Sequence, residues 1–338
     1  MRIRPDGLER LQNQTLPLEQ WMVQARVPGA TIAVIRSGEI VFSKAYGVRD
    51  TRGTPMREGV LFECASLTKS LFALLAMQEV DAGALSLDQP IMEIFREPPW
   101  SQDARFGSIT PRQVLSHGSG LPNWENKPMH LLFDPGTRYS YSGEGYFLLQ
   151  RLIEQLEGKS MEQLFRERFY GRFGMESSTA YWTPAVSAAF SEGFDKEGKV
   201  TKVRNARRVS GNGPEPNAAW SLYSYAADYA RFLCAMIREH GGLSDEAFAQ
   251  MTSRQNTATP EIFWGLGFGI PKKDENVLWH WGDNDGFQSF AVWDRITGDG
   301  AVLQTNGNGG VEVYLSAMKA LLEGDFWEDI RDFIRNAE

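Results

Sequence analysis

The chain has 338 residues, of which 42% are hydrophobic and 12% aromatic, and its formal net charge is -8. This apolar content is ample for a large core, either in one large domain or in two interlocked ones. The negative charge argues against a nucleic-acid partner, because binding a phosphate backbone needs a basic face. The short basic run RNARR at 204–208 is interpreted as a solvated loop.

The N-terminal segment, residues 1–30, carries charges throughout and lacks the apolar centre of a signal peptide. No run elsewhere approaches the ~18 apolar residues of a membrane span. We therefore expect a cytoplasmic protein without a membrane span, although a chain trimmed of its export signal would read the same way. Cys64 and Cys234 show neither metal nor redox spacing, which predicts two buried thiols rather than a disulfide.

In chain order, the apolar spacing predicts a helical segment over about 7–27 and then a hairpin. The hairpin is indicated by two β-branched runs around Ser37-Gly38 in TIAVIRSGEIVFSKAYGVRD. Over about 66–248 the periodicity is mainly helical, with loops rich in proline and glycine. The runs FWGLGFGI, NVLWHWGD, GFQSFAVWD and GAVLQTN then predict an antiparallel meander, followed by an amphipathic segment over about 311–335.

These elements predict an α+β fold, in which an antiparallel sheet is flanked by N- and C-terminal helices and a mainly helical lobe is inserted. The sheet lobe would comprise 1–65 and 250–338, and the helical lobe 66–249. An active site would lie in the cleft between the lobes, because Ser66 stands where the chain passes from the sheet to the helices.

A serine and a lysine stand three residues apart in ECASLTKSLFALLAMQ. Residues at i and i+3 share one face of a helix, so Ser66 and Lys69 can meet in a cleft. The positive end of the helix dipole disfavours the protonated form of Lys69, so the neutral amine could take the proton of the serine hydroxyl. The backbone N–H of Ser66, which has no partner within the helix, can point at an oxyanion. The alternative is an N-cap serine followed by a solvated lysine.

Two further motifs accompany this pair. PGTRYSYSGEGY places Tyr141 in a loop ahead of an apolar helix, either as a packing residue or as a base kept as phenolate by nearby cations such as Lys69. WHWGDNDGF places His280 and Gly282 on a predicted strand, where the glycine would let a backbone or substrate approach closely. The alternative there is a bulge with a surface histidine.

Several stretches in order carry a likeness to a known family: SLTKS, GALSLDQPI, ITPRQVLSHGSGLP, PGTRYSYSGEGY, AAWSLYSYAADYARFL, WGLGFGI and HWGDNDGF. Over about 28–306 the chain resembles the serine β-lactamase and penicillin-binding-protein superfamily, and within it the class C-like esterase, D-aminopeptidase and carboxypeptidase branch. The resemblance implies that Ser66 is the acylated nucleophile, Lys69 its proton-handling partner and Tyr141 the second base.

The same resemblance assigns the remaining parts of the site. His280, Trp281 and Gly282 would form the third motif, and the backbone N–H of Asp283 would join that of the nucleophile in the oxyanion hole. His117, in LSHGSGLP, would be a packed loop histidine rather than a base.

Two departures from the family pattern fall on substrate recognition. Gly143 stands where the family often has an asparagine, so an amide that could bind the acyl side chain of a β-lactam is missing. His280 replaces the lysine common in true β-lactamases, so a permanent cation for a substrate carboxylate is missing too. Both losses weaken a β-lactamase assignment and leave acyl transfer intact. Trp281, Trp124 and Phe287 would suit an apolar acyl or aryl group, or would be core.

The predicted function is that of a serine hydrolase acting through an acyl-enzyme on small esters or amides, with a small-molecule or peptide-like substrate and no cofactor. Ester hydrolysis is the preferred candidate activity. The alternatives are D-amino-acid peptidase or carboxypeptidase activity and weak β-lactamase activity. A catalytically silent, ligand-binding member of the fold is the non-enzyme alternative. The sequence has four histidines, His117, His130, His240 and His280, and their spacing matches no metal-binding motif. This argues against a metallohydrolase. The oligomeric state is left open.

Overall fold

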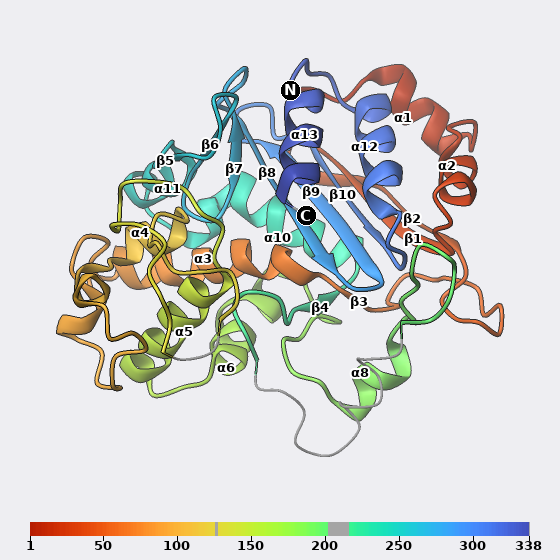
Figure 1. Ribbon diagram of the computed structural model, residues 1–338. Helices are drawn as coiled ribbons and strands as arrows, with labels where there is room; N and C mark the ends of the chain where they lie inside the picture. Colours follow the sequence, from red (N-terminus) through yellow and green to blue (C-terminus); the bar gives the residue numbers. More distant parts are fainter. Residues whose placement is uncertain (126–127, 202–215, 338) are drawn as a thin grey trace.

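The computed structural model describes residues 1–125, 128–201 and 216–337. Within these residues, eight strands form one antiparallel sheet in the order β2-β1-β10-β9-β8-β7-β6-β5, with helices on both of its faces (Figure 1). The α+β fold predicted from the sequence is confirmed. The basic run at 204–208 lies outside the described residues.

The N-terminal helical segment is divided into two helices, α1 (Pro5–Gln12) and α2 (Leu18–Gln24). The helical structure predicted over 7–27 is present, but it forms two helices and not one continuous segment. Gln14 adopts a left-handed backbone with φ 58°, and Pro17 precedes the first residue of α2, so the chain cannot run on as one helix.

The predicted hairpin consists of β1 (Gly29–Arg36) and β2 (Glu39–Gly47). Ser37 and Gly38 both have positive φ, 49° and 78°, as in the tight turns that match the twist of paired strands. On its other side β1 pairs with β10 (Gly300–Thr305), so the two ends of the chain contribute neighbouring strands to one sheet.

The predicted C-terminal meander is also present. Its central strand β8 (Val277–Asn284) carries the third motif and pairs along its whole length with β9 (Phe287–Asp294). The shorter strands continue the sheet to its edge: β7 (Gly269–Pro271), β6 (Ile262–Trp264) and β5 (Asn256–Thr257).

Alternate residues of β1 enter two separate apolar clusters, one on each face of the sheet. Ile32 and Val34 pack in the cluster that includes α1, α2, α12 (Gly310–Leu321) and α13 (Trp327–Ala337). Ala33 and Ile35 pack in the cluster that includes α3 (Thr68–Asp81) and α10 (Ala226–Glu239). The amphipathic segment predicted over 311–335 is therefore two helices that cover one face of the sheet.

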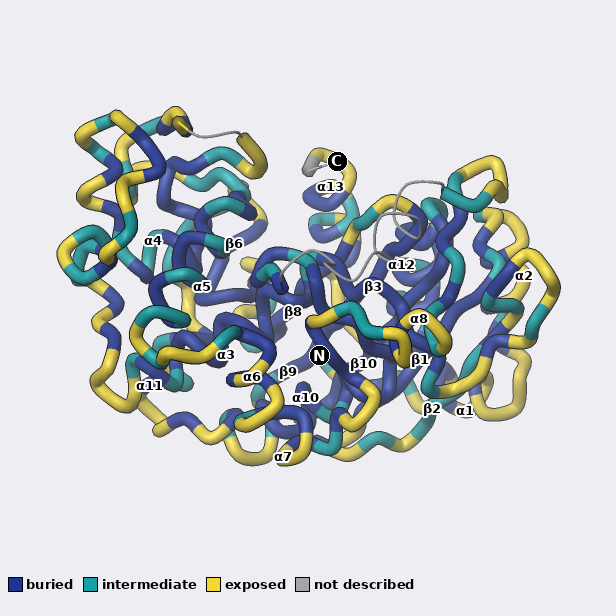
Figure 2. The backbone as a smooth tube through the Cα atoms, turned by 90° about the horizontal axis from the view of Figure 1, so that it is seen from below, coloured by how far each residue is buried: buried dark blue, intermediate teal, exposed yellow. Residues whose placement is uncertain are grey.

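The middle of the chain is mainly helical, and α3 is buried along nearly its whole length at the centre of the molecule (Figure 2). Among the described residues of this part of the chain, the other helices are α4 (Pro111–Leu115), α5 (Gly143–Glu157), α6 (Met161–Phe165), α7 (Gly171–Phe173), α8 (Pro184–Ala189) and α11 (Asp245–Thr252). Short turns lie at Ala65–Leu67, Ile91–Glu93, Ala104–Ser108, Arg166–Tyr170 and His240–Gly242. A small ribbon pairs β3 (Phe62–Glu63) with β4 (Tyr223–Ser224). The division into lobes at 65/66 and 249/250 stays a prediction.

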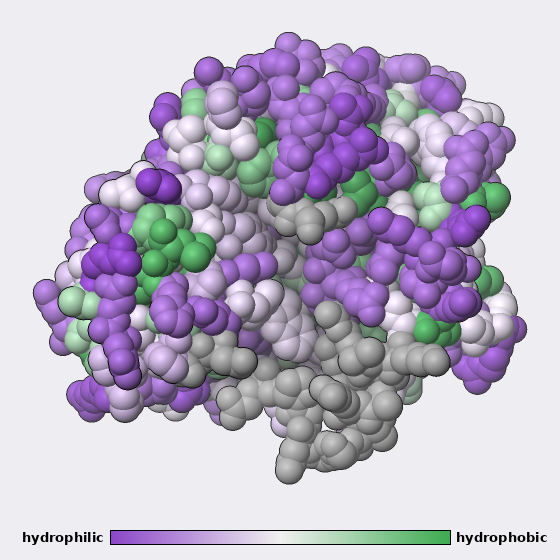
Figure 3. Space-filling view, viewed as in Figure 1, coloured by the Kyte–Doolittle hydropathy of each residue, from purple (hydrophilic) through white to green (hydrophobic). Residues whose placement is uncertain are grey.

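The face of the molecule seen in Figure 3 is largely hydrophilic, with apolar residues gathered in small patches. Among the described residues, no helix is both long and apolar enough to span a bilayer. Cys64 and Cys234 are buried free thiols, as the sequence predicted.

Candidate active site

Ser66 lies at a sharp turn between β3 and α3. Ala65, directly before it, has a left-handed φ of 48°, a conformation that costs energy for a residue with a Cβ. The turn is held by Thr68, whose hydroxyl donates to the Ala65 carbonyl at 2.6 Å and accepts the Leu222 N–H at 3.0 Å. Ser66 is half-exposed while every other residue of 61–70 is buried, so the turn presents this one hydroxyl at the surface of a cavity.

Lys69 lies in the first turn of α3, with its side chain fully enclosed. Its Nζ is 3.1 Å from Ser66 Oγ and donates to the Ala219 carbonyl at 2.7 Å. Burial lowers the pKa of Lys69 well below its usual value, which favours the uncharged amine. An uncharged amine keeps a lone pair, and the Ser66 hydroxyl is in position to donate to it.

Tyr141 lies beside both residues, with its ring centroid 4.8 Å from Lys69 Nζ. Its hydroxyl oxygen is buried and has no hydrogen-bond partner among the described residues. Burial raises the pKa of the Tyr141 phenol. Of the two alternatives drawn from the sequence for Tyr141, burial disfavours the phenolate in the resting site and favours the protonated phenol.

His280 lies on β8 and is 1% exposed, which excludes the alternative of a surface histidine on a bulge. Its Nδ1 is 2.6 Å from the Trp281 carbonyl and must carry a proton to donate to it, so Nε2 holds the lone pair. Burial lowers the pKa of His280 to about 3. His280 is therefore neutral near pH 7, and the third motif lacks a cation, as its replacement of the family's lysine implied.

Gly282 brings β8 into close contact with the turn that holds the serine. A Cβ at this position would lie 2.2 Å from the Cys64 carbonyl oxygen and 3.2 Å from the Ala65 Cβ. The close backbone approach predicted for this glycine is therefore present. Asp283, the next residue, lines the same cavity as Ser66, and its carboxylate accepts from Gln288 Nε2 at 3.2 Å. The oxyanion role of its N–H stays a prediction.

A cavity of about 190 Å³, which we call the reaction cavity, unites most of the predicted residues. It is lined by Ser66, Lys69, Asn123, Trp124, Tyr141, Trp220, Trp281, Asp283 and Asn284. Phe287 does not belong to it, because its ring is buried against Phe62 and Phe190 in the core.

Sequence reasoning missed three residues of this lining: Asn123, Trp220 and Asn284. Asn123 directly follows ITPRQVLSHGSGLP, and Trp220 lies within AAWSLYSYAADYARFL, so both adjoin stretches that already carried the family likeness. Neither has a spacing that indicates chemistry, and only their proximity to those stretches could have drawn attention to them.

Gly143 lies beside this cavity, beneath the ring of Trp124. A Cβ on Gly143 would lie 2.6 Å from two atoms of the indole, so the ring occupies the space of a side chain at that position. The Gly143 N–H donates to Asn123 Oδ1 at 2.9 Å. The departure from the family's asparagine is thus matched by a tryptophan packed over the glycine.

His117 is fully buried, as expected of a packed loop histidine. Its Nδ1 accepts the Ser142 N–H at 3.1 Å, and its ring centroid lies 4.2 Å from that of Tyr141. Burial lowers the pKa of His117 well below its usual value, so the ring is neutral. The His117 ring therefore packs against the Tyr141 ring and helps to hold it in place.

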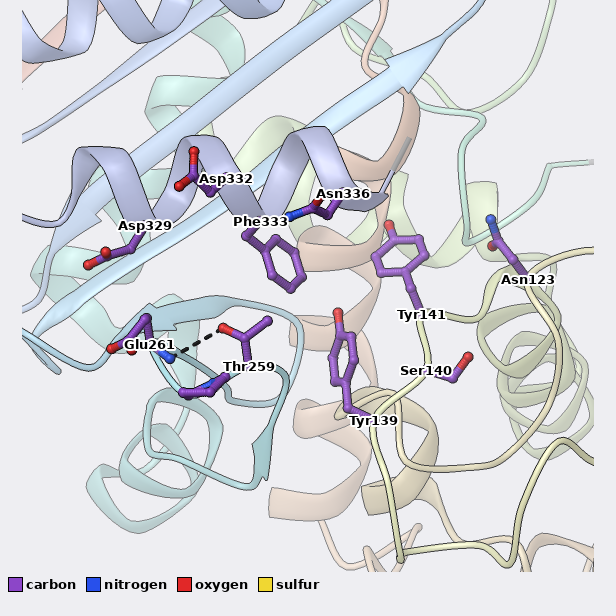
Figure 4. A pocket seen from close by; sticks show the side chains of 11 residues that line it. Asn123, Tyr139, Ser140, Tyr141, Thr259, Glu261, Asp329, Asp332, Phe333 and Asn336 are labelled. Atoms are coloured by element: carbon purple, nitrogen blue, oxygen red, sulfur yellow. Dashed lines mark hydrogen bonds between the residues drawn. The ribbon is translucent and has the colours of Figure 1, made fainter.

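A second cavity, of about 490 Å³, adjoins the reaction cavity and is called here the α13 cavity. Asn123 and Tyr141 line both cavities. Figure 4 shows Tyr139 and Tyr141 directing their hydroxyls toward α13, from which Phe333 and Asn336 face them. Within the described part of the chain, no group of three or more histidine, cysteine or carboxylate side chains could hold a metal ion.

A partly exposed serine at hydrogen-bond distance from a buried lysine, with a tyrosine beside both, is the arrangement expected in serine hydrolases whose nucleophile is activated by a lysine. Residues 16–324 match the family model described as Beta-lactamase, and the chain belongs to that family of β-lactamase-type serine hydrolases. The resemblance stated from the sequence is confirmed.

The chain is 24% identical over 324 residues to the unguisins hydrolase ungD' of Aspergillus campestris, covering 86% of this chain and 59% of that protein. It is 38% identical over 108 residues to the esterase EstB of Burkholderia gladioli, covering 31% of this chain and 28% of the esterase. It is 26% identical over 225 residues to penicillin-binding protein 4 of Amycolatopsis lactamdurans, covering 61% and 56% of the two chains. The chain therefore matches less than two thirds of the length of these relatives.

Two solved structures share the fold. D-alanine carboxypeptidase AmpC from Burkholderia cenocepacia superposes with a TM-score of 0.77 at 21% identity, covering 93% of this chain and 98% of that one. The octameric penicillin-binding protein homologue from Pyrococcus abyssi superposes with a TM-score of 0.76 at 22% identity, covering 92% and 77%. At these identities the likeness establishes the fold.

Proposed function

We propose that this protein is a serine hydrolase that works through an acyl-enzyme on small esters or amides, with ester hydrolysis as its leading activity. The observation that carries the proposal is the pairing of Ser66 with Lys69. The serine is partly exposed in a cavity, and burial lowers the pKa of the amine 3.1 Å away, which favours its uncharged form. An uncharged lysine at hydrogen-bond distance is the base that a serine hydroxyl needs to become a nucleophile.

In the acylation step, Ser66 Oγ forms a bond to the substrate carbonyl carbon while its proton passes to Lys69 Nζ. The carbonyl electron pair moves to oxygen, where the N–H groups of Ser66 and Asp283 would stabilise it. The tetrahedral species collapses, the bond to the leaving group breaks, and the leaving group takes the proton of the Tyr141 phenol. The resulting lysine cation and tyrosinate lie next to each other, so each stabilises the other's charge.

In the deacylation step, water attacks the acyl carbon and gives its proton to the Tyr141 phenolate. Collapse of the second tetrahedral species breaks the bond to Ser66 Oγ, which takes back its proton from Lys69. The resting state is restored, with serine hydroxyl, neutral amine and protonated phenol. One water has been consumed, and one acid and one alcohol or amine have been released.

The lining of the reaction cavity is suited to bind substrates that carry apolar acyl or aryl groups. Trp124, Trp220 and Trp281 supply aromatic walls, and Trp124 is 52% exposed at the cavity mouth. His280 is neutral, so the third motif offers no cation to a substrate carboxylate. This chemistry favours uncharged esters over β-lactams, and it agrees with the likeness to an esterase.

The test compares the rates of p-nitrophenyl butyrate hydrolysis by the protein and by its Ser66→Ala variant, both confirmed folded by circular dichroism. We expect the variant to lose the activity. Ser187→Ala, on an exposed position of α8, is the matched control and should keep it. Equal rates for Ser66→Ala and the unsubstituted protein would reject the proposal and favour the silent, ligand-binding alternative.

A further inference from the structure

The position of Tyr141 marks the side of the site on which the leaving group lies. In the proposed reaction its phenol gives a proton to the leaving group, so that group must come within reach of the Tyr141 hydroxyl. Figure 4 shows this hydroxyl directed toward α13, and Tyr141 lines the α13 cavity as well as the reaction cavity. The alcohol or amine part of the substrate therefore extends from Ser66 past Tyr141 into the α13 cavity.

One part of the α13 cavity is aromatic. Tyr139 and Phe333 both line it, with ring centroids 6.2 Å apart and ring planes at 67° to each other. The hydroxyl oxygen of Tyr139 is buried, faces the cavity and has no hydrogen-bond partner among the described residues. A buried hydroxyl without a partner is rare in folded proteins, so its direction indicates that a ligand with a polar group enters this cavity.

Another part of the same lining is acidic. Figure 4 shows Asp329 and Asp332 on α13 and Glu261 on the turn between β5 and β6, and no described lining residue is a lysine, arginine or histidine. From outside the lining, Lys273 pairs with Asp329 at 2.9 Å and also senses the charge of Glu261, and Arg331 pairs with Asp332 at 2.9 Å. Three carboxylates thus face two cations, and Glu261 forms no ion pair with any described residue.

An ammonium group fits both features of this lining. Uncompensated negative charge attracts a cation, and so do the faces of aromatic rings. A carboxylate or phosphate on the leaving group would instead be repelled, and the neutral His280 offers it no compensating charge.

Resting on the proposed function, we propose that the α13 cavity binds a cationic leaving group, with its ammonium beside Glu261 and against the rings of Tyr139 and Phe333. The substrate class is then esters or amides whose alcohol or amine part carries a quaternary or protonated ammonium group. Hydrolysis consumes one water and releases the acid together with an amino alcohol or a diamine.

The test compares butyrate esters whose alcohols have the same shape and differ in charge. Butyrylcholine is paired with 3,3-dimethylbutyl butyrate, and 6-(trimethylammonio)hexyl butyrate, with a longer spacer, is paired with 7,7-dimethyloctyl butyrate. The ratio of kcat/KM within a pair, divided by the ratio of the two rates with hydroxide, measures what the cation contributes. We expect the protein to prefer the cationic ester by about tenfold in at least one pair, and the preference to fall as salt is added.

Two variants of Glu261 locate the cation. Glu261→Gln keeps the size of an exposed side chain and removes its charge, so it should lower kcat/KM for the preferred cationic ester about fivefold more than for the neutral isostere. Glu261→Lys should abolish the preference. Glu275→Gln is the matched control, because it removes the same charge at an exposed position that lines neither cavity, and it should keep the preference.

An unchanged preference in Glu261→Gln, or an equal fall for both esters of a pair, would overturn the proposal. A protein that hydrolyses p-nitrophenyl butyrate but prefers neither cationic ester refutes this inference alone. A protein that hydrolyses neither p-nitrophenyl butyrate nor any of these four esters refutes the proposed function with it.

Discussion

Replacing Gly282 by alanine tests whether β8 positions the nucleophile. The added Cβ would lie 2.2 Å from the Cys64 carbonyl oxygen, whereas ordinary contacts begin at 3.4 Å, so the strand and the turn must separate by about 1 Å. The opposing atom is backbone in a buried segment and cannot swing aside. Overpacking of this kind costs about 1–3 kcal/mol of folding free energy, and a 1 Å displacement of a reacting group can cost about a hundredfold in rate.

The assay pairs thermal unfolding with kcat for p-nitrophenyl butyrate. We expect Gly282→Ala to lower Tm by several degrees and to lower kcat by about a hundredfold, because Cys64 and the strained Ala65 directly precede Ser66. Gly107→Ala is the matched control: no atom lies within 4 Å of its added Cβ, and its backbone φ is not left-handed. A Gly282→Ala protein with unchanged Tm and kcat would refute the reasoning.

Four further predictions concern the charges and the walls of the reaction cavity. Because burial lowers the pKa of Lys69, kcat/KM should stay level above neutral pH and fall in acid as the amine takes a proton; a rise continuing toward the usual lysine pKa near 10.5 would contradict this. The lowered pKa also affects stability, because between the folded pKa of Lys69 and 10.5 the unfolded chain binds more protons than the folded one. The free energy of unfolding, measured with denaturant and compared with that of Lys69→Met, should therefore increase from about pH 8 to about pH 10. The increase should be up to ~1.4 kcal/mol per pH unit. Tyr141→Phe should lower turnover by at least about a hundredfold while leaving Tm unchanged, since the hydroxyl has no hydrogen-bond partner among the described residues; a large loss of Tm would show a structural role instead. Gly143→Asn should destabilise the protein by about 1–3 kcal/mol through its clash with Trp124, and Trp124→Ala in the same chain should restore Tm; no rescue would place the strain elsewhere.

The elements that could be predicted from the sequence are those with local signals. The hairpin at Ser37-Gly38 and the C-terminal meander follow from alternating apolar residues and turn residues, and both are present. The break between α1 and α2 was missed, because helical spacing continues across it while Gln14 and Pro17 interrupt the backbone.

The candidate site was predicted in its residues but not in its charges. The spacing of Ser66 and Lys69 indicated a shared face, and the two side chains do meet. The charge states of Tyr141 and His280 could not be read from their neighbours in sequence, because burial by distant segments sets both. The same limit applies to Asn123, whose side-chain oxygen accepts the N–H of Gly143 at the start of α5.

The measurement that tests the central claim most directly is covalent labelling by a fluorophosphonate, followed by peptide mapping. The account predicts a single label on the peptide that contains Ser66, and loss of that label in Ser66→Ala. It also predicts much slower labelling of Lys69→Ala, because the serine then lacks its base. An unlabelled protein, or a label that persists in Ser66→Ala, would contradict the claim that Ser66 is an activated nucleophile.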